Sequence, residues 1–344
     1  MSFVKSNKKY DAILVAGEGK SSYKVHHQNK AFLTINGKCL VHYIVETLQQ
    51  VESIRDIYVV GLKDKLQQVF LTGHVDLNFP KRVHIVKQRS NLYENVWHTF
   101  LESLKNENGE VPNTESHRDQ AMLIVPCDAP LMTPQEVEYF ISHANMENYD
   151  HVLGLVSQKQ LKYFYPQEGK PGIKMAYLHI KEDSFRINNL HLVKPLRIEN
   201  REYIQKMYQY RYQRNFKNLV LFALSIFGKD KARHYKNYIG LQLCLFFASL
   251  RLSFLVNYFR KFNPKKVLEK RICTIMKTRF MALEVPYPGA ALDIDNAKDY
   301  ESMKTRFDEW CKYLQASKEP LTKNHAKVSL TTSDEKVGRP SPTH

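Results

Sequence analysis

Short apolar runs alternate with segments of helical apolar spacing along the first third of the chain, and this alternation limits the fold more than any other feature. Buried-strand character is found at residues 12–16, 57–62 and 83–86. Helical spacing is found at 40–51, 63–71 and 91–104. Such a rhythm predicts an α/β fold with a mostly parallel sheet and helices on both of its faces.

A glycine-containing turn follows the first of these strands. After Ala16 come Gly17, Glu18 and Gly19, and the lysines nearest to the turn are Lys20, Lys24 and Lys30. Glycine lets the backbone approach a ligand closely, so that consecutive N–H groups point at phosphate oxygens while lysines supply positive charge. In parallel sheets ligands bind beyond the carboxyl ends of the strands, where this turn would lie. The segment predicts either a phosphate-binding loop or an ordinary strand-end turn.

A further strand at 121–125 leads into Asp128 and then into the start of a helix. Thr133, Pro134 and Glu136 have the spacing of a capping box with proline at the first helical position. Asp128 is therefore expected at the same sheet edge as the glycine turn. It either caps a turn there or binds a cation.

Two more aspartates stand just before the last helical segment. If the chain is extended there, alternation puts the side chains of Asp293 and Asp295 on the same side. Asp295 can also be the N-cap of the helix.

Taken together, these segments resemble the MobA-like nucleotidyltransferases of the NTP-transferase superfamily. The strings that carry the resemblance are LVAGEG followed by NKAFLTINGKCL, then DAPLMTPQEV, and finally DIDNAKDY. The resemblance covers residues 10–198 and 283–312. Two positions depart from the family pattern: Glu18 replaces the second glycine, and the usual loop arginine is absent, with Lys20 or Lys24 the nearest substitutes.

The resemblance implies a Rossmann-like fold of the nucleotide-diphospho-sugar transferase type. It also implies Mg²⁺-dependent transfer of a nucleoside monophosphate from a nucleoside triphosphate to a phosphorylated acceptor, a sugar phosphate or polyol phosphate, with release of pyrophosphate. The implied catalytic residues are Lys30 and Asp128, and the implied metal ligands are Asp128, Asp293 and Asp295. Asp293 is the expected partner of Asp128, because Mg²⁺ in proteins binds one or two carboxylates together with phosphate oxygens, and Asp295 is a further ligand or a loop organiser. The implied nucleotide-binding residues are Ala16, Gly17, Glu18, Gly19, Lys20, Lys24 and Lys30.

Two other functions are compatible with these residues. A metal-dependent glycosyltransferase that uses a nucleotide sugar also has a D-x-D motif, and residues 293–295 fit its letters, but such a motif normally lies in the middle of a domain. A non-catalytic nucleotide-binding protein that docks on membranes is supported by Glu18 and by the missing arginine. Release of pyrophosphate distinguishes both alternatives from nucleotidyl transfer.

Polar residues lie on the strand-like segments 177–180 and 186–193, which follow a strand predicted at 151–156. Lys174, Arg186, Asn188 and Asn189 either contact an acceptor phosphate or belong to an ordinary hairpin surface.

The formal charge of +16 is concentrated in one segment. Residues 201–280 contain 18 Lys and Arg against three acids, a net charge of 18 − 3 = +15. The same region holds strongly apolar runs at 219–227 and 239–259. Helices that lie in a membrane interface, with cations on the polar side, account for both features and predict peripheral contact with an anionic membrane.

The alternatives for this region are a helical insertion that packs on the catalytic domain or forms a homodimer, and a transmembrane span. Gln242, Arg251 and Asn257 make a span costly. Nucleic acid is not the expected partner, because the apolar runs are too continuous for a solvated binding face.

These observations predict an α/β core at 1–198, a basic, apolar helical insertion at 199–282, a return to the core at 283–316, and a disordered tail at 317–344. The five cysteines, with no C-x-x-C pair, fit a reducing compartment, and the apolar run near the amino terminus is too short for a signal peptide. We therefore expect a cytoplasmic protein, peripheral at the inner face of the membrane if the insertion binds lipid.

Overall fold

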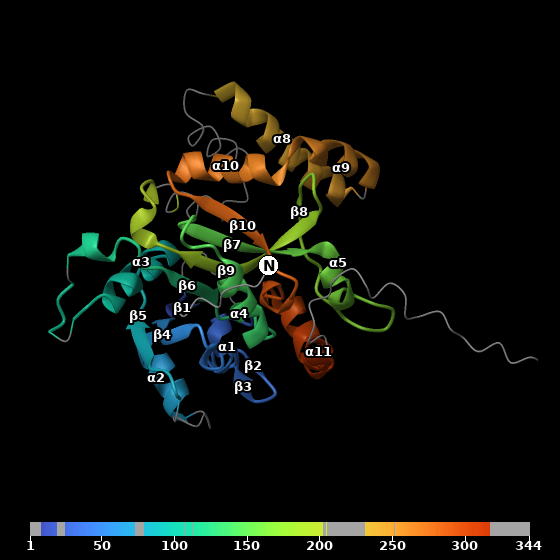
Figure 1. Ribbon diagram of the computed structural model, residues 1–344. Helices are drawn as coiled ribbons and strands as arrows, with labels where there is room; N and C mark the ends of the chain where they lie inside the picture. The colour runs from blue at the N-terminus through green and yellow to red at the C-terminus, as the bar shows by residue number, and fades with distance from the viewer. Residues whose placement is uncertain are drawn as a thin grey trace, which may run out of the picture.

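The computed structural model describes residues 8–18, 25–72, 79–106, 108–111, 113–201, 204, 231–250 and 252–316. Among these residues eight strands form one sheet (Figure 1). Seven of them lie side by side in the order β10 (Phe280–Glu284), β7 (His151–Ser157), β9 (Ser184–Val193), β6 (Met122–Pro126), β1 (Tyr10–Ala16), β4 (Ile54–Gly61) and β5 (Val83–Lys87). The eighth, β8 (Leu178–His179), pairs with β9.

The predicted mostly parallel sheet is confirmed. Strand β1 runs parallel to β4 and to β6, β4 runs parallel to β5, and β10 runs parallel to β7. The exception in the main order is β9, which is antiparallel to both β6 and β7. In the β1–β6 pair Val15 lies opposite Pro126, so the turn after β1 and the turn after β6 leave the sheet at the same edge.

Helices cover both faces of the sheet, also as predicted. On one face α1 (Leu40–Gln49), α4 (Pro134–His143) and α11 (Ala297–Ala316) enclose the larger apolar core. On the other face α3 (Leu92–Ser103) packs on a smaller core that contains Ile13, Tyr58 and Phe100. The short α2 (Lys63–Thr72) lies near β5, and α5 (Gln158–Leu161) follows β7. The predicted helix cap at the start of α4 is confirmed, because Thr133 accepts a hydrogen bond from the Glu136 N–H at 3.2 Å.

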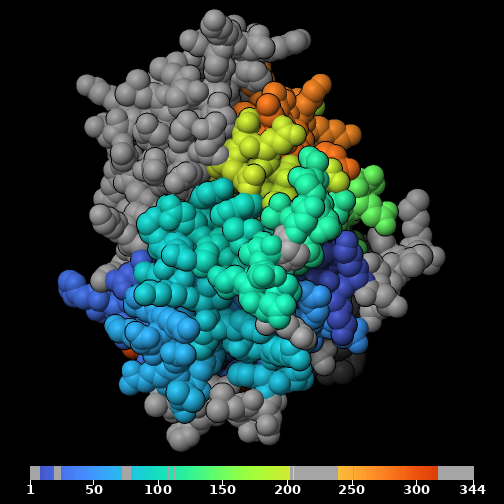
Figure 2. All heavy atoms as spheres, turned by 90° about the vertical axis from the view of Figure 1, so that its left-hand side faces the viewer, coloured from blue at the N-terminus to red at the C-terminus, as the bar shows by residue number. Residues whose placement is uncertain are grey.

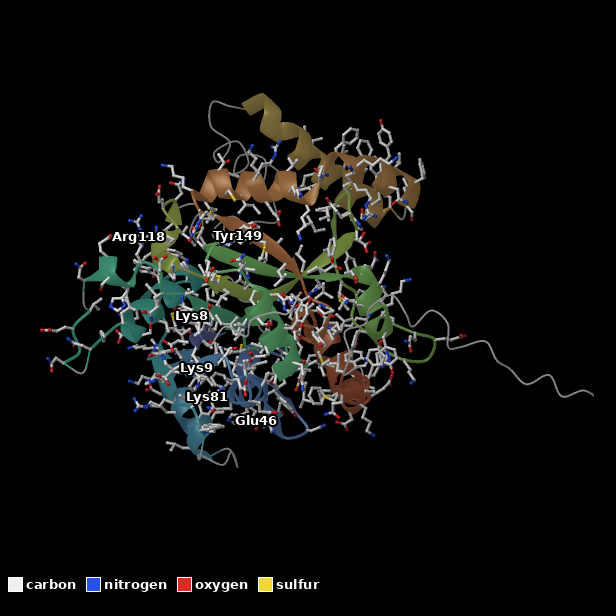
Figure 3. The ribbon with its side chains drawn as sticks, viewed as in Figure 1. Lys8, Lys9, Glu46, Lys81, Arg118 and Tyr149 are labelled. Atoms are coloured by element: carbon white, nitrogen blue, oxygen red, sulfur yellow. The ribbon has the colours of Figure 1, made fainter. Side chains whose placement is uncertain are left out.

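Two lysines lie at the end of the sheet opposite to these two turns, where the parallel strands begin. Lys9 precedes β1 and Lys81 precedes β5 (Figure 3). Lys81 exchanges two backbone-to-side-chain hydrogen bonds of 2.9 Å with Gln49 and donates from Nζ to the Leu48 carbonyl at 3.0 Å. Burial lowers the pKa of Lys81, and the charge of Lys9 lowers it further. These contacts tie the end of α1 to the entry of β5.

The sequence prediction missed a short hairpin and an edge strand. The hairpin pairs β2 (Thr34–Ile35) with β3 (Lys38–Cys39), and its turn residues Asn36 and Gly37 have φ values of 48° and 78°. An Asn-Gly pair is the strongest local signal for such a turn. The edge strand is β10, which begins inside the predicted insertion.

The described part of the insertion is helical. Its elements are α8 (Lys231–Ser249), α9 (Ser253–Phe259), the 3₁₀ turn η5 (Arg260–Phe262) and α10 (Lys265–Met276). The apolar run predicted at 239–259 is therefore divided between α8 and α9. Leu268, Ile272 and Cys273 of α10 pack on a cluster that includes Phe280 of β10. No helix among the described residues has the length and apolar content needed to cross a membrane.

Several predictions fall on residues outside this description. The apolar run at 219–227 and the tail at 317–344 lie wholly outside the described residues.

Candidate active site

The turn after β1 is held by residues that the sequence did not point to. Gln88, which follows β5, accepts a hydrogen bond from the Glu18 N–H at 2.6 Å and donates Nε2 to the Glu18 carbonyl at 3.0 Å. A Cβ on Gly17 would lie 2.8 Å from Asn95 Nδ2, so a larger residue at this position would have to displace the Asn95 side chain. Ala16 is buried. Gly19, Lys20 and Lys24 lie outside the described residues.

Lys30 is placed at this edge by its neighbour Asn29. The Asn29 side chain donates to the Ala16 carbonyl at 3.2 Å and accepts from the Ala31 N–H at 2.9 Å, which caps the 3₁₀ turn η1 (Lys30–Phe32). The loop that carries Lys30 is thereby tied to the end of β1. From this position Lys30 Nζ donates to Asp128 Oδ2 at 2.8 Å.

Asp128 follows β6 and lies where the sequence predicted it. Its backbone carbonyl accepts from the Ile294 N–H at 2.9 Å, which brings the late segment of the chain onto the end of β6. The side chains of Lys30 and Asp128 are 17% and 16% exposed. Burial raises the pKa of Asp128, and the charge of Lys30 opposes that rise. Burial alone would lower the pKa of Lys30, but the facing carboxylates raise it, so the ammonium stays charged.

Asp293 and Asp295 reach the same place from the opposite end of the sequence. Arg186 of β9 donates NH2 to Asp293 Oδ1 at 2.7 Å, and the same nitrogen lies 3.7 Å from an oxygen of Asp295. Lys30 Nζ also lies 3.7 Å from Asp295. The Asp295 side chain is 61% exposed and forms the open side of the cluster. Partial desolvation of the Asp295 carboxylate by the atoms of the cluster, followed by the charge of Asp293, raises its pKa to about 6.

The alternative role for Asp295, as the N-cap of the last helix, is taken by its neighbour. Asn296 Oδ1 accepts from the N–H groups of Lys298 and Asp299 at 2.9 and 3.1 Å. Asp299 Oδ2 in turn accepts from Asn296 Nδ2 at 2.7 Å. The cap of α11 is therefore an Asn–Asp pair, and the Asp295 side chain is left to face Lys30 and Arg186.

The segment that carries Asp293 is fixed by contacts from α4 and β9. The Ala290 N–H donates to the buried Glu136 Oε2 at 2.8 Å. Arg186 Nε donates to the Ala291 carbonyl at 2.9 Å, and Asn189 Nδ2 donates to the Ala290 carbonyl at 3.3 Å. These contacts hold the 3₁₀ turn η6 (Gly289–Ala291) against the end of the sheet.

Of the four polar residues predicted near the acceptor, Arg186 and Asn189 thus contact the Asp293 segment directly. Asn188 is fully buried and accepts from the Leu190 N–H at 3.2 Å, whereas Lys174 is exposed. Gln88 and Glu136 were not predicted as site residues. Glu136 could be found only as a capping residue of α4.

The three aspartates of this cluster are candidate ligands for a divalent metal ion. Among the described residues no group of three or more His, Cys, Asp or Glu side chains is gathered as a metal site. The three aspartates are nevertheless linked to one another through Lys30 and Arg186. Carboxylate oxygens are the ligands that Mg²⁺ prefers, and three negative charges face two positive ones, so the chemistry of the set fits a hard cation.

Comparison with known proteins agrees with this architecture. Residues 12–166 match the model of the MobA-like NTP transferase domain. A hypothetical transferase from Thermus thermophilus has 20% sequence identity and a TM-score of 0.56, with 85% of this chain and 99% of that chain covered. No curated protein matches the sequence.

Two other solved structures share lower similarity. One is a CMP:2-keto-3-deoxy-manno-octonic acid synthetase complexed with CTP, at 10% identity, a TM-score of 0.45 and coverage of 88% of this chain and 99% of that one. The other is a 4-diphosphocytidyl-2C-methyl-D-erythritol synthase from Anaerococcus prevotii, at 11% identity, a TM-score of 0.41 and coverage of 90% and 98%. The family match extends from β1 past the end of β6, so this part of the chain is a MobA-like NTP transferase domain with a Rossmann-like nucleotidyltransferase fold.

Proposed function

We propose that this site transfers a nucleoside monophosphate from a nucleoside triphosphate to a phosphorylated acceptor, a sugar phosphate or a polyol phosphate. The observation that carries the proposal is the cluster of Lys30, Arg186 and three aspartates at the carboxyl ends of β1 and β6. Lys30 and Asp128 lie inside the matched residues 12–166, and the other members join them from later in the chain. An oxygen of the acceptor phosphate forms a bond to the α-phosphorus. The bond from that phosphorus to the bridging oxygen breaks, and pyrophosphate leaves with the electron pair.

The chain's own groups would contribute position and charge to this reaction. The triphosphate would lie against the turn that begins at Gly17, and Gln88, which binds both the N–H and the carbonyl of Glu18, would fix the backbone of that turn in place. Lys30, kept charged by its carboxylate neighbours, would stabilise the negative charge that develops on the leaving pyrophosphate.

Mg²⁺ is the proposed cofactor, with Asp128 and Asp293 as its ligands and Asp295 as a third on the open side. When bound there it would neutralise phosphate oxygens and orient the triphosphate. Arg186 would keep the Asp293 carboxylate in place through its contact of 2.7 Å.

The direct test is pyrophosphate release by the purified protein in Mg²⁺, with CTP, GTP, UTP or ATP offered against a pool of sugar phosphates and polyol phosphates. Asp128→Asn is expected to lower turnover at least a hundredfold without unfolding the protein. Asp119→Asn is the matched control, because Asp119 precedes β6 at the opposite edge and pairs with Arg197 at 2.9 Å.

Each other outcome would point elsewhere. Release of a nucleoside diphosphate from a nucleotide sugar would indicate glycosyl transfer. Nucleotide binding without turnover across the whole pool would indicate a binding protein.

A further inference from the structure

The helix α9 and the turn η5 expose a stripe of aromatic side chains to solvent. Phe254, Tyr258 and Phe262 are spaced four residues apart, so they lie on one face, and this set is the α9 stripe. Phe254 is 69% exposed and the other two are more than half exposed. Large apolar side chains gathered in this way mark contact surfaces rather than ordinary protein surface.

The neighbouring helix α8 has a stripe of the same kind. Ile239, Phe246 and Leu250 follow one another at seven and four residues, which again puts them on one helical face, here named the α8 stripe. Each of them is about half exposed. The two stripes therefore leave apolar side chains in water on two helices that pack against each other through Phe247 and Phe259, whose rings stack at 5.4 Å.

The stripes are presented by a well-anchored layer. Arg260 Nε donates to the Ile180 carbonyl at 2.7 Å, and the Lys265 N–H donates to Glu182 at 3.0 Å. Val256 of α9 is buried on the side away from the α9 stripe, where its carbonyl faces the Cys244 thiol. Because these contacts already use the inner sides of the helices, packing on the α/β core does not account for the exposed aromatic side chains.

The charge around the stripes is strongly positive. Between residues 252 and 277 the cations are Arg260, Lys261, Lys265, Lys266, Lys270, Arg271 and Lys277, and the single acid is Glu269. Lys261, Lys266 and Lys270 are exposed, and no ion pair among the described residues involves them. Lys261 also lines an open depression of about 510 Å³ together with Phe254, Leu255, Asn257 and Tyr258. An amine and an amide beside aromatic rings suit a phosphate head group whose acyl chains lie against the rings.

We propose that this part of the insertion, with the α8 and α9 stripes, Lys261 beside the α9 stripe, and the exposed Lys266 and Lys270 of α10, binds the surface of an anionic phospholipid bilayer. Exposed aromatic and aliphatic residues insert at the boundary of head groups and acyl chains, while the lysines contact lipid phosphates. Nucleic acid would leave the apolar stripes in water. A second copy of this chain would oppose cations to cations. The face lies at the end of the sheet away from α2 (Figure 1), and the orange residues near 260–280 lie in the upper right of the view in Figure 2.

The test is co-sedimentation of the full chain with vesicles of phosphatidylcholine alone and of phosphatidylcholine mixed with phosphatidylglycerol. We expect binding to the anionic vesicles and its loss at high salt. The triple variant Phe254→Ser, Tyr258→Ser, Phe262→Ser should bind at least tenfold more weakly. Replacing Lys261, Lys266 and Lys270 by Gln should weaken binding roughly a hundredfold, since each lysine near an anionic surface is worth about fivefold.

The matched control is Leu71→Ser in α2, because Leu71 is 72% exposed but lies beside β5 at the other end of the sheet. It should bind vesicles like the wild type, and thermal unfolding of all variants should remain unchanged because every substituted side chain is exposed. A second readout replaces Tyr258 or Leu71 by Trp and measures quenching by brominated lipid, which is expected for Tyr258→Trp and not for Leu71→Trp.

Three results would overturn the proposal. One is that the full chain does not bind anionic vesicles, as expected if another segment of the chain covers the stripes. Another is equal binding by wild type and both triple variants. The last is a dimer in sedimentation velocity that the α9 variant dissociates, which would assign the face to a second copy of the chain.

Discussion

Glu136 offers the sharpest test of how the site is assembled. Its side chain is fully buried between the first turn of α4 and the turn η6, and Oε2 accepts from the Ala290 N–H at 2.8 Å. Burial raises the pKa of this carboxyl well above 4.5, and the N–H groups of Ala290 and Thr133 offset part of that rise. We therefore expect the folded protein to keep a proton on Glu136 at pH values where the unfolded chain has lost it.

The linkage between proton binding and folding fixes the sign of the effect. Above about pH 4.5 the folded state holds more protons than the unfolded state, so the free energy of unfolding falls as pH rises toward the folded pKa of Glu136. The slope is at most about 1.4 kcal/mol per pH unit. Glu136→Gln has no titrating carboxyl, so its free energy of unfolding should not show this decline. The free energy of unfolding of the variant minus that of wild type should therefore rise by up to about 4 kcal/mol as pH increases by three units.

Urea unfolding followed by circular dichroism at pH 5, 6, 7 and 8 measures this difference. The pH slope carries the test, because a constant offset between the two proteins reports only local packing. Glu136→Ala should also lack the pH slope. Its free energy of unfolding should in addition be lower by about 2–4 kcal/mol at every pH, because the substitution leaves a cavity and an unpaired Ala290 N–H. A difference between wild type and Glu136→Gln that does not change with pH would refute the assignment of a protonated Glu136.

Other substitutions test separate contacts. Gly289→Ala should cost about 2–3 kcal/mol of unfolding free energy in urea, because its Cβ would lie 2.2 Å from the Leu131 carbonyl oxygen; unchanged stability would contradict that packing. Burial and the charge of His191 lower the pKa of His151 to about 3, so wild type should lose about 2–4 kcal/mol between pH 6.5 and pH 4, and His151→Phe should flatten this dependence. Gln88→Leu should raise KM for the nucleotide about tenfold by freeing the Glu18 backbone, and a KM equal to that of wild type would refute this role.

The parts of the fold that sequence patterns could predict are those with a periodic signal. Apolar alternation and helical spacing located β1, α1, β4 and α3, because each element buries one defined face. The direction of β9 was not accessible, since its side-chain pattern is the same whether it runs parallel or antiparallel to its neighbours.

Side-chain partners across the sheet were harder to predict than the strands themselves. Gln88 holds Glu18 from a position 70 residues away, and Arg186 pairs with Asp293 across 107 residues. Gln88 was not singled out by the sequence, and Arg186 was one of four polar residues for which the pattern left open a contact with an acceptor phosphate; its pairing with Asp293 was not predicted. Their role arises where the carboxyl ends of several strands converge at one edge, which is a property of the tertiary structure.

The site contains three carboxylates and two cationic side chains. Lys30 neutralises Asp128 at 2.8 Å, and Arg186 neutralises Asp293 at 2.7 Å. Asp295 is left to share both cations at 3.7 Å, and the neighbouring negative charge helps to raise its pKa to about 6. A polyanionic triphosphate would add more negative charge to a cluster that already has one carboxylate in excess. Binding the nucleotide therefore requires further positive charge, and this imbalance is the physical reason to propose Mg²⁺ beside Asp128 and Asp293.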